Sequence, residues 1–294
     1  MKTEIKGVIS ALITPFSNGD VDFVSLEKLI QFQLEKGIDG LVVNGTTAES
    51  PTLSWAEVSK IFMFTRKIVG DQFPLIIGTG SNSTDKTIET TKKACDLGAQ
   101  AALVVVPYYN KPPQRGLAAH FKAVAECSSL PVIVYNVPGR TITALSVDTI
   151  VELSKVQNII GIKEASGDLK QDQELFSRLS KDFLMLTGDD PTYIDFLKLG
   201  GHGVISVMSN ILTQECAQWS AWCQAKDFNK AEVDFKKYSK LIQLMYCEAN
   251  PIPLKWMLYK KGLIKSPELR LPLSTLDEKF YDQILTEMKL LGVV

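Results

Sequence analysis

The stretch "IIGIKEAS" (residues 159–166) is a short apolar run that ends in a lysine and a glutamate. It is one of eight such runs, which recur at intervals of roughly 20 to 35 residues. Their nearly continuous Val, Ile and Leu content is typical of parallel strands covered on both faces. The other seven runs are "GVISALITPF" (7–16), "GLVVNG" (40–45), "PLIIGTG" (74–80), "AALVVVPY" (101–108), "PVIVYNV" (131–137), "FLMLTGD" (183–189) and "GVISVMSN" (203–210).

The segments between these runs have apolar residues at helical spacing. "VSLEKLIQFQLEKG" (24–37) and "WAEVSKIFMFTRKIVG" (55–70) both end in glycine, as helices commonly do. Eight strand-helix units in a row predict an α/β fold, the (β/α)8 TIM barrel. An open doubly wound sheet usually has fewer strands.

The strand pattern stops after Asn210, and only helical patterns follow. They cover residues 212–224, 227–248, 251–262 and 275–291. We predict that the first of them completes a barrel domain, residues 1–225, which carries the catalytic residues. Residues 226–294 are then a C-terminal helical extension, although no Pro- or Gly-rich linker marks the boundary.

The composition limits the class of partner. The chain has 294 residues, 45% of them hydrophobic, and a net charge of -1 with no dense Lys or Arg patch, which argues against a nucleic-acid partner. No apolar run reaches about 18 residues, so no membrane span is expected. The balanced charge favours small molecules as partners. The five cysteines form no CxxC pair, which favours reduced thiols and a cytoplasmic protein.

In a TIM barrel the active site lies at the carboxyl ends of the strands, where Lys163 is the unusual residue. Strand alternation turns Gly161, Lys163 and Ala165 towards the barrel interior and Glu164 away from it. Desolvation lowers the pKa of a buried lysine, so that more of it is the neutral, nucleophilic amine. Imine formation with a carbonyl requires this form. The alternative is that Lys163 sits above the rim and pairs with Glu164 or Asp168.

Hydroxyl groups and one cation lie at neighbouring strand ends. They are Thr46 and Thr47, Tyr108 and Tyr109, Tyr135, and Arg140. Hydroxyls can relay protons, and a guanidinium can hold a carboxylate in a bidentate pair. Each also has a structural explanation: a helix cap for the threonines, packing at the barrel mouth for the tyrosines, and a surface ion pair for Arg140.

No histidine or cysteine occurs at these strand ends, so we expect no metal site. The two histidines fall elsewhere, His120 in a predicted helix and His202 in the "GGHG" loop before the last strand. The glycine-rich segment "GTGSN" (78–82) lacks the third glycine of a dinucleotide-binding loop. We read both glycine-rich segments as turns.

The order and spacing of these motifs resemble the dihydrodipicolinate synthase and N-acetylneuraminate lyase family of class I aldolases over nearly the whole chain. The motifs are "NGTTAES", "TGSNST", "PYYNKP", "YNVPGRT", "GIKEASG", "TGDD", "GVISVMSN" and "NPIPLKW". The resemblance implies a barrel with a C-terminal helical domain, a homotetramer built as a dimer of dimers, and a Schiff base between Lys163 and pyruvate. The implied reaction needs no metal or organic cofactor, because the imine itself is the electron sink.

The resemblance also implies individual roles. Tyr135 is the proton donor and acceptor, Thr46 and Tyr109 complete the relay, and Tyr109 reaches in from a neighbouring subunit. The residues that bind substrate are Thr47, Arg140, Gly188 and Ile205. "YNVP" followed by arginine is similar to the synthase branch, in which the arginine holds the carboxylate of L-aspartate 4-semialdehyde. The expected reaction is its condensation with pyruvate in lysine and diaminopimelate synthesis.

Two alternatives stay open on the sequence. One is another pyruvate-dependent aldolase of the family, acting on N-acetylneuraminate or a 2-keto-3-deoxy sugar acid, which Arg140 disfavours. The other is a barrel that binds a carbonyl metabolite without chemistry, which the reactive lysine disfavours.

The chain departs from the usual family pattern at three places. Ala48 stands where glycine is usual, so the loop is rearranged if that position needs a positive φ. "TITALS" follows Arg140, and Gly139 replaces a usual serine, which predicts a differently shaped pocket for the second substrate. Trp55, Val58 and Lys86 stand where lysine-inhibited members have polar or acidic residues. We therefore expect little or no inhibition by L-lysine.

Overall fold

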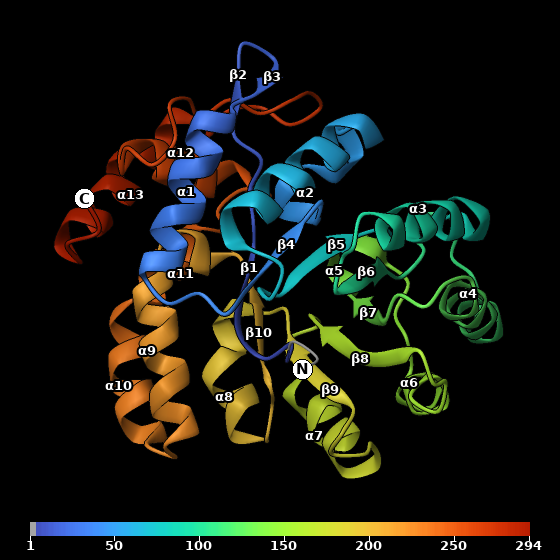
Figure 1. Cartoon of the computed structure of the whole chain (residues 1–294). Helices are drawn as coiled ribbons and strands as arrows, with labels where there is room; N and C mark the ends of the chain where they lie inside the picture. The colour runs from blue at the N-terminus through green and yellow to red at the C-terminus, as the bar shows by residue number, and fades with distance from the viewer. Residues whose placement is uncertain (1–3) are drawn as a thin grey trace. The chain divides into compact units, whose positions relative to one another are not determined.

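The computed structural model describes residues 4–294 and contains the predicted parallel strands. The eight strands close into a barrel in the order β1-β10-β9-β8-β7-β6-β5-β4, which is the TIM-barrel fold expected from the sequence (Figure 1). Their bounds are β1 (Gly7–Ala11), β4 (Gly40–Val43), β5 (Leu75–Gly78), β6 (Ala101–Val105), β7 (Val132–Asn136), β8 (Ile159–Glu164), β9 (Leu184–Thr187) and β10 (Gly203–Ser206).

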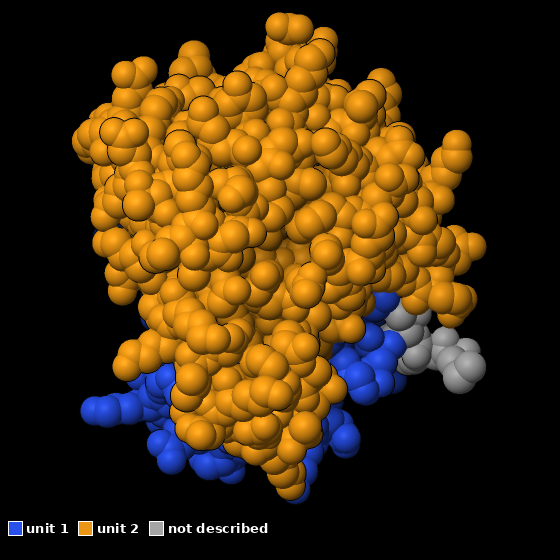
Figure 2. All heavy atoms as spheres, turned by 90° about the vertical axis from the view of Figure 1, so that its left-hand side faces the viewer, with its two compact units in different colours: residues 1–6, 74–205 blue, residues 7–73, 206–294 orange. Residues whose placement is uncertain are grey.

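The described residues divide into two compact units, coloured separately in Figure 2. The first unit comprises residues 4–6 and 74–205, and the second comprises residues 7–73 and 206–294. This division does not test the predicted boundary between residues 225 and 226, which stays a prediction. Each unit is described by itself below.

The first unit is a parallel sheet with helices that follow each strand. Strands β5 to β9 pair in sequence order, and β10 pairs with β9. Neighbouring helices of this unit pack against one another in chain order (Figure 1). The helices are α3 (Thr84–Asp96), α4 (Gln114–Glu126), α5 (Pro138–Thr141), α6 (Val147–Leu153), α7 (Leu169–Arg178), η3 (Asp190–Thr192) and α8 (Tyr193–Lys198).

Strand β8 contains an irregularity that affects which way its side chains point. Val132 of β7 pairs with Ile159 of β8, but Ile133 pairs with Gly161, so the register skips Ile160. From Gly161 onwards the pairing is regular to the end of the strand. A bulge of this kind redirects the side chains that follow it.

The second unit holds β1 and β4, which pair in parallel, and most of the helices. Helices α1 and α2 pack together, as do α9 and α10 (Figure 1). The helices are α1 (Phe23–Glu35), η1 (Thr46–Ala48), η2 (Ser50–Thr52), α2 (Trp55–Val69), η4 (Met208–Asn210), α9 (Thr213–Gln224), α10 (Phe228–Lys237), α11 (Ser239–Leu244), α12 (Ile252–Lys260), η5 (Glu278–Phe280) and α13 (Tyr281–Leu290).

Local sequence explains the ends of these helices. Ser54 caps α2 in a reciprocal capping box with Glu57, and Gly70 ends the helix with a φ of 78°. Asp22 caps α1 through hydrogen bonds from the backbone N–H groups of Val24 and Ser25. The helices predicted over 24–37 and 55–70 are therefore confirmed, to within a few residues at each end.

The helix predicted over 227–248 is wrong in one respect, because two helices occupy it. The N–H of Tyr238 donates to the carbonyl of Phe235, three residues back, so the chain tightens between α10 and α11. Trp219 of α9 contacts Phe235 and Tyr238 edge-on, with ring centroids 4.9 and 5.3 Å away. These contacts of Trp219 hold the chain at the break, which helical periodicity does not reveal.

A small hairpin, β2 (Phe16–Ser17) and β3 (Asp20–Val21), was not predicted. Its turn consists of Asn18 and Gly19, which have φ values of 54° and 85°. Asn-Gly is the preferred pair for a two-residue hairpin turn with positive φ, so the signal was present in the sequence. Within residues 4–294, no helix has both the length and the apolar character needed to cross a membrane.

Candidate active site

Lys163 and Tyr135 lie side by side at the carboxyl ends of β8 and β7. They are partners in the strand register, and the lysine Nζ lies 4.4 Å from the centroid of the tyrosine ring. Both side chains are buried, with 5% and 7% of their surface exposed. The interpretation of Lys163 as a rim residue paired with Glu164 or Asp168 is therefore wrong.

The register also places two predicted substrate-binding residues on the face that carries Lys163. Lys163 pairs with Leu186 of β9, and Leu186 pairs with Gly203 of β10. Side chains alternate along a strand, so Gly188 and Ile205, two positions further on, belong to the same face. A Cβ at Gly188 would overlap Cε of Lys163, so only glycine leaves room for the lysine side chain.

The environment of Lys163 favours its neutral amine. Burial lowers the pKa of the Lys163 ammonium to about 7, and the nearby Arg140 guanidinium lowers it further while Asp190 opposes the shift. Asp190 is fully buried and follows β9. A lysine with this pKa is substantially unprotonated at neutral pH, as nucleophilic attack on a carbonyl requires.

We expect the rate at which Lys163 captures pyruvate to rise about tenfold per pH unit below 7 and to level off above it, because only the neutral amine attacks. The protein is incubated briefly with pyruvate across this range and quenched with borohydride, and the reduced adduct is quantified by intact-protein mass spectrometry. A rate that keeps rising up to about pH 10, the ordinary range of lysine, would contradict the lowered pKa.

Arg140 lies on the short helix α5, just beyond β7, and its side chain is exposed. The segment after it is held from within, because the Thr141 hydroxyl donates to the carbonyls of Val137 and Thr143. Ile142 has a φ of 62° and is exposed. The "TITALS" departure thus forms a defined turn directly after Arg140.

Tyr109, which is predicted to be catalytic, lies at the surface of this chain. Its side chain is 89% exposed, and its backbone has a φ of 75°, which is unusual for a bulky residue. Asn110 holds the same loop by donating from Nδ2 to the carbonyl of Asn82. The predicted contribution of Tyr109 to a neighbouring subunit stays a prediction.

Thr46 and Thr47 lie in the second unit, in the short helix η1 that follows β4. Thr46 is half-buried and Thr47 is buried. The Thr47 hydroxyl accepts a hydrogen bond of 2.9 Å from Nδ2 of Asn250. The "NPIPLKW" motif, which begins at Asn250, thereby holds the threonine loop.

The loop does not need glycine at Ala48. The left-handed residues of this segment are Asn44 and Glu49, each with a φ of 59°, while Ala48 is a buried residue inside η1. The rearrangement that would follow from a positive φ at Ala48 does not occur. The strained position in the "GTTAES" loop is Glu49.

Sequence analysis missed the group that fixes Glu49. Lys255 is fully buried, and its Nζ lies 2.5 Å from a Glu49 carboxylate oxygen and donates to the carbonyl of Glu268. The backbone N–H of Arg270 donates to the other Glu49 oxygen. Burial lowers the pKa of Lys255 to about 8, although Glu49 opposes the shift. A lysine within the apolar run 252–258 was the available signal.

The other unusual residues of the sequence have structural surroundings. His120 is in α4, as predicted, where its Nδ1 lies 3.0 Å from the Thr84 hydroxyl. His202 accepts a hydrogen bond at Nδ1 from the backbone of Met185. Across residues 4–294, no three His, Cys, Asp or Glu side chains come together in a way that could hold a metal ion.

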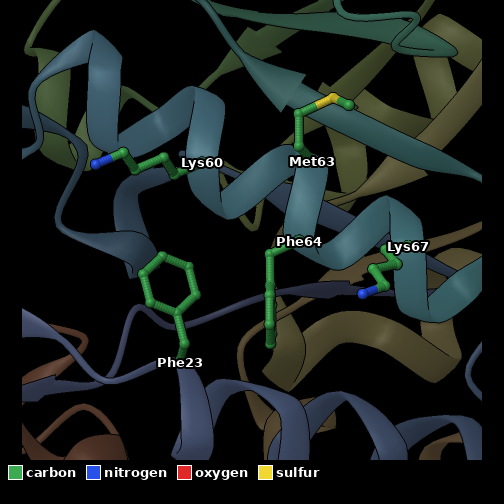
Figure 3. A pocket seen from close by; sticks show the side chains of 5 residues that line it. All are labelled: Phe23, Lys60, Met63, Phe64 and Lys67. Carbon is green, nitrogen blue, oxygen red and sulfur yellow. The ribbon is translucent and has the colours of Figure 1, made fainter.

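A shallow hollow also lies on the surface of the second unit, between the start of α1 and helix α2 (Figure 3). It is lined by Phe23, Lys60, Met63, Phe64 and Lys67. The rings of Phe23 and Phe64 meet edge-on, with centroids 5.0 Å apart. None of the residues predicted for the active site lines this hollow.

Comparison with known proteins identifies the family. The model of the dihydrodipicolinate synthetase family matches residues 4–290. A 4-hydroxy-tetrahydrodipicolinate synthase of Bdellovibrio bacteriovorus is 51% identical over 289 residues, which are 98% of this chain and 99% of the relative.

Solved structures give the same result. The chloride-inhibited dihydrodipicolinate synthase of Acinetobacter baumannii, in complex with pyruvate, has a TM-score of 0.96 and 43% identity, covering 99% of this chain and 100% of that one. A monomeric dihydrodipicolinate synthase variant has a TM-score of 0.96 and 39% identity over 98% of this chain and 97% of its own. The chain therefore belongs to the dihydrodipicolinate synthetase family.

Proposed function

We propose that Lys163 forms an imine with pyruvate and that Tyr135 moves the protons of the reaction. The observation that carries this proposal is a buried lysine with a pKa of about 7, placed beside a buried tyrosine at the ends of adjacent strands. The neutral lysine Nζ adds to C2 of pyruvate, one proton is taken up and water leaves, which yields a protonated imine. This cation draws electrons from C3, so a proton can depart from C3 to give the enamine.

The enamine then forms the new carbon-carbon bond. Its C3 attacks the aldehyde carbon of L-aspartate 4-semialdehyde, and the aldehyde oxygen takes up a proton to become a hydroxyl. The amino group of the bound adduct next adds to C2, the carbon of the imine. The bond from C2 to Lys163 Nζ breaks, which closes the ring and regenerates the free lysine. Since the imine is the electron sink, the proposed sequence includes no step for a metal or organic cofactor.

The overall activity follows from the family and from relatives that match nearly the whole chain. These relatives are 4-hydroxy-tetrahydrodipicolinate synthases, so the chain is a lyase-type enzyme with that activity, in lysine and diaminopimelate biosynthesis. Pyruvate and L-aspartate 4-semialdehyde are its small-molecule substrates.

Further roles are proposed for single residues. Gly188 and Ile205 share the face of Lys163, which supports a contact with the pyruvate unit. Arg140 is exposed and electrostatically coupled to Lys163, which supports its role in holding the carboxylate of the semialdehyde. The roles of Thr46 in the proton relay and of Thr47 in pyruvate binding rest on the "NGTTAES" resemblance.

Turnover with competing aldehydes tests the second substrate. We expect condensation of pyruvate with L-aspartate 4-semialdehyde, and an Arg140→Ala variant with a KM for the semialdehyde raised at least about tenfold and a nearly unchanged KM for pyruvate, since a bidentate ion pair is lost. N-Acetylmannosamine and glyceraldehyde serve as the alternative aldehydes. Faster turnover with either would favour a lyase or sugar-acid aldolase, and imine formation without turnover would favour a binding protein.

Assembly, location and control are also proposals. The exposed Tyr109, with its positive φ, fits a residue that reaches a partner subunit, which supports the homotetramer built as a dimer of dimers. The five free cysteines support a cytoplasmic location. Weak inhibition by L-lysine rests on Trp55, Val58 and Lys86 and stays a prediction.

A further inference from the structure

A row of buried polar residues lies behind the catalytic pair, on the opposite face of the same strands. Asn136 of β7 pairs with Glu164 of β8, and Glu164 pairs with Thr187 of β9. All three are buried, and none has more than 2% of its surface exposed. Each residue directly follows a position on the Lys163 face, since Asn136 follows Tyr135 and Glu164 follows Lys163. Polar groups in such a position are costly unless they are fully hydrogen-bonded.

Glu164 satisfies this requirement with three donors. Its carboxylate accepts hydrogen bonds from Nδ2 of Asn136 at 2.8 Å, from the backbone N–H of Ser166 at 2.9 Å and from Nε2 of Gln171 at 3.3 Å. Gln171 belongs to α7, so the side chain of Glu164 points towards the helix layer, as strand alternation predicts. The carboxylate connects the end of β8 to β7 and to α7.

Asn136 extends this connection to the segment that follows Arg140. Its Oδ1 accepts a hydrogen bond of 3.0 Å from the backbone N–H of Leu145. Its backbone carbonyl accepts the N–H of Ala165, and the carbonyl of Glu164 accepts the N–H of Gly188. Asn136 and Glu164 thus form both side-chain and backbone hydrogen bonds at the carboxyl ends of β7 and β8, where the loops begin.

We propose that Asn136 and Glu164 are positioning residues for the reaction, because their hydrogen bond fixes the ends of β7 and β8 and so holds Tyr135 against Lys163. This inference rests on the proposed roles of those two residues. The physical reason is that Asn136 directly follows Tyr135 in the chain and Glu164 directly follows Lys163. A shift of either buried residue therefore moves the backbone that carries its catalytic neighbour. A displacement of about 1 Å between reacting groups can cost a factor of about 100 in rate.

The donor pattern requires an ionised carboxylate at Glu164. All three of its side-chain partners donate, so a protonated or amidated side chain would leave a donor facing another donor. Burial raises the pKa of Glu164, and it raises that of the neighbouring Asp172 to about 7, with Glu164 contributing.

The test compares two asparagines that hold the same pair of strands at opposite ends. Asn158 precedes β8, and its Nδ2 donates to the carbonyls of Ala125, Ser128 and Leu130. We expect Asn136→Ala to lower kcat about 10- to 100-fold, with the KM for pyruvate changed less than about threefold. Asn158→Ala should lower the melting temperature about as much as Asn136→Ala does. It should nevertheless keep kcat within about twofold of the parent protein, because the amino end of the strands lies away from the chemistry.

A swapped pair keeps the test valid if Asn136→Ala folds poorly. Asn136→Asp alone places two carboxyl groups in contact. Asn136→Asp with Glu164→Gln restores one hydrogen bond in the reverse direction, and Gln171, which donates to the same Glu164 oxygen as Asn136, can accept the second N–H of the new amide once its own amide group is turned over. The double variant should recover kcat at least about tenfold over Asn136→Asp alone. Equal losses of kcat in Asn136→Ala and Asn158→Ala, or no recovery in the double variant, would overturn the proposal. Borohydride trapping on the unmodified protein separates the two claims, because a missing adduct on Lys163 would overturn the proposed function itself.

Discussion

Replacing Lys163 by methionine is expected to lower kcat by at least about 10⁴-fold, because the variant has no amine to form the imine and the remaining groups cannot substitute for it. Methionine keeps a flexible chain of similar length in the space that Gly188 leaves open. It also removes an amine whose charged form burial disfavours, so the variant should remain folded. Steady-state consumption of pyruvate with the semialdehyde measures the loss, and thermal unfolding verifies the fold.

Lys255 provides an internal control for this prediction. Both lysines are buried and have lowered pKa values, about 7 for Lys163 and about 8 for Lys255. Only Lys255 is tied into an ion pair, with Glu49, and the carbonyl of Glu268 accepts a further hydrogen bond from it. After borohydride reduction with pyruvate, peptide mapping should locate the adduct on Lys163 alone. An adduct on Lys255, or none on Lys163, would contradict the mechanism.

The second large effect is expected on stability. Lys255→Met should lower the free energy of unfolding by about 3 kcal/mol, because the Glu49 carboxylate loses its cation while it stays buried. Glu49 also occupies a strained backbone position with a φ of 59°, in the loop that carries Thr46 and Thr47. Denaturant unfolding followed by circular dichroism measures the change.

An ion pair with an exposed lysine supplies the comparison. Lys237 pairs with Asp234 at 2.7 Å on α10, with its side chain 62% exposed. Lys237→Met should cost less than about 1 kcal/mol, as is usual for surface ion pairs. The double variant Glu49→Gln with Lys255→Met should recover roughly half of the loss, since no unpaired charge remains buried. If Lys255→Met is no more destabilising than Lys237→Met, the buried pair contributes little.

The catalytic strand shows how far sequence reasoning extends. A charge at the end of an apolar run, together with alternation, was enough to place Lys163 on the inner face and Glu164 on the outer face. The partners of Glu164 were not predictable in the same way. Asn136 lies 28 residues away, and Gln171 belongs to a different element, so local periodicity carries no information on these contacts.

The threonine loop shows the opposite balance. Ala48 suggested a rearranged loop, yet the strain falls on Glu49, where an ion pair with Lys255 of the distant α12 stabilises it. Composition gives no hint of such a contact, because a lysine in an apolar helix has many potential partners. The hairpin at Asn18 and Gly19 is a different case, since its turn signal is local and lies within the sequence of the turn itself.

The sequence by itself determined the eight strands, most of the helices and the inward-facing position of Lys163, because local patterns of apolar and polar residues encode burial and helix capping. Tertiary structure alone decided the skipped register at Ile160, the contact of Lys163 with Tyr135, and the buried pairs Asn136–Glu164 and Glu49–Lys255. These features arise where segments far apart in the chain must satisfy buried charges and backbone groups together. Their geometry depends on packing, which periodicity cannot specify.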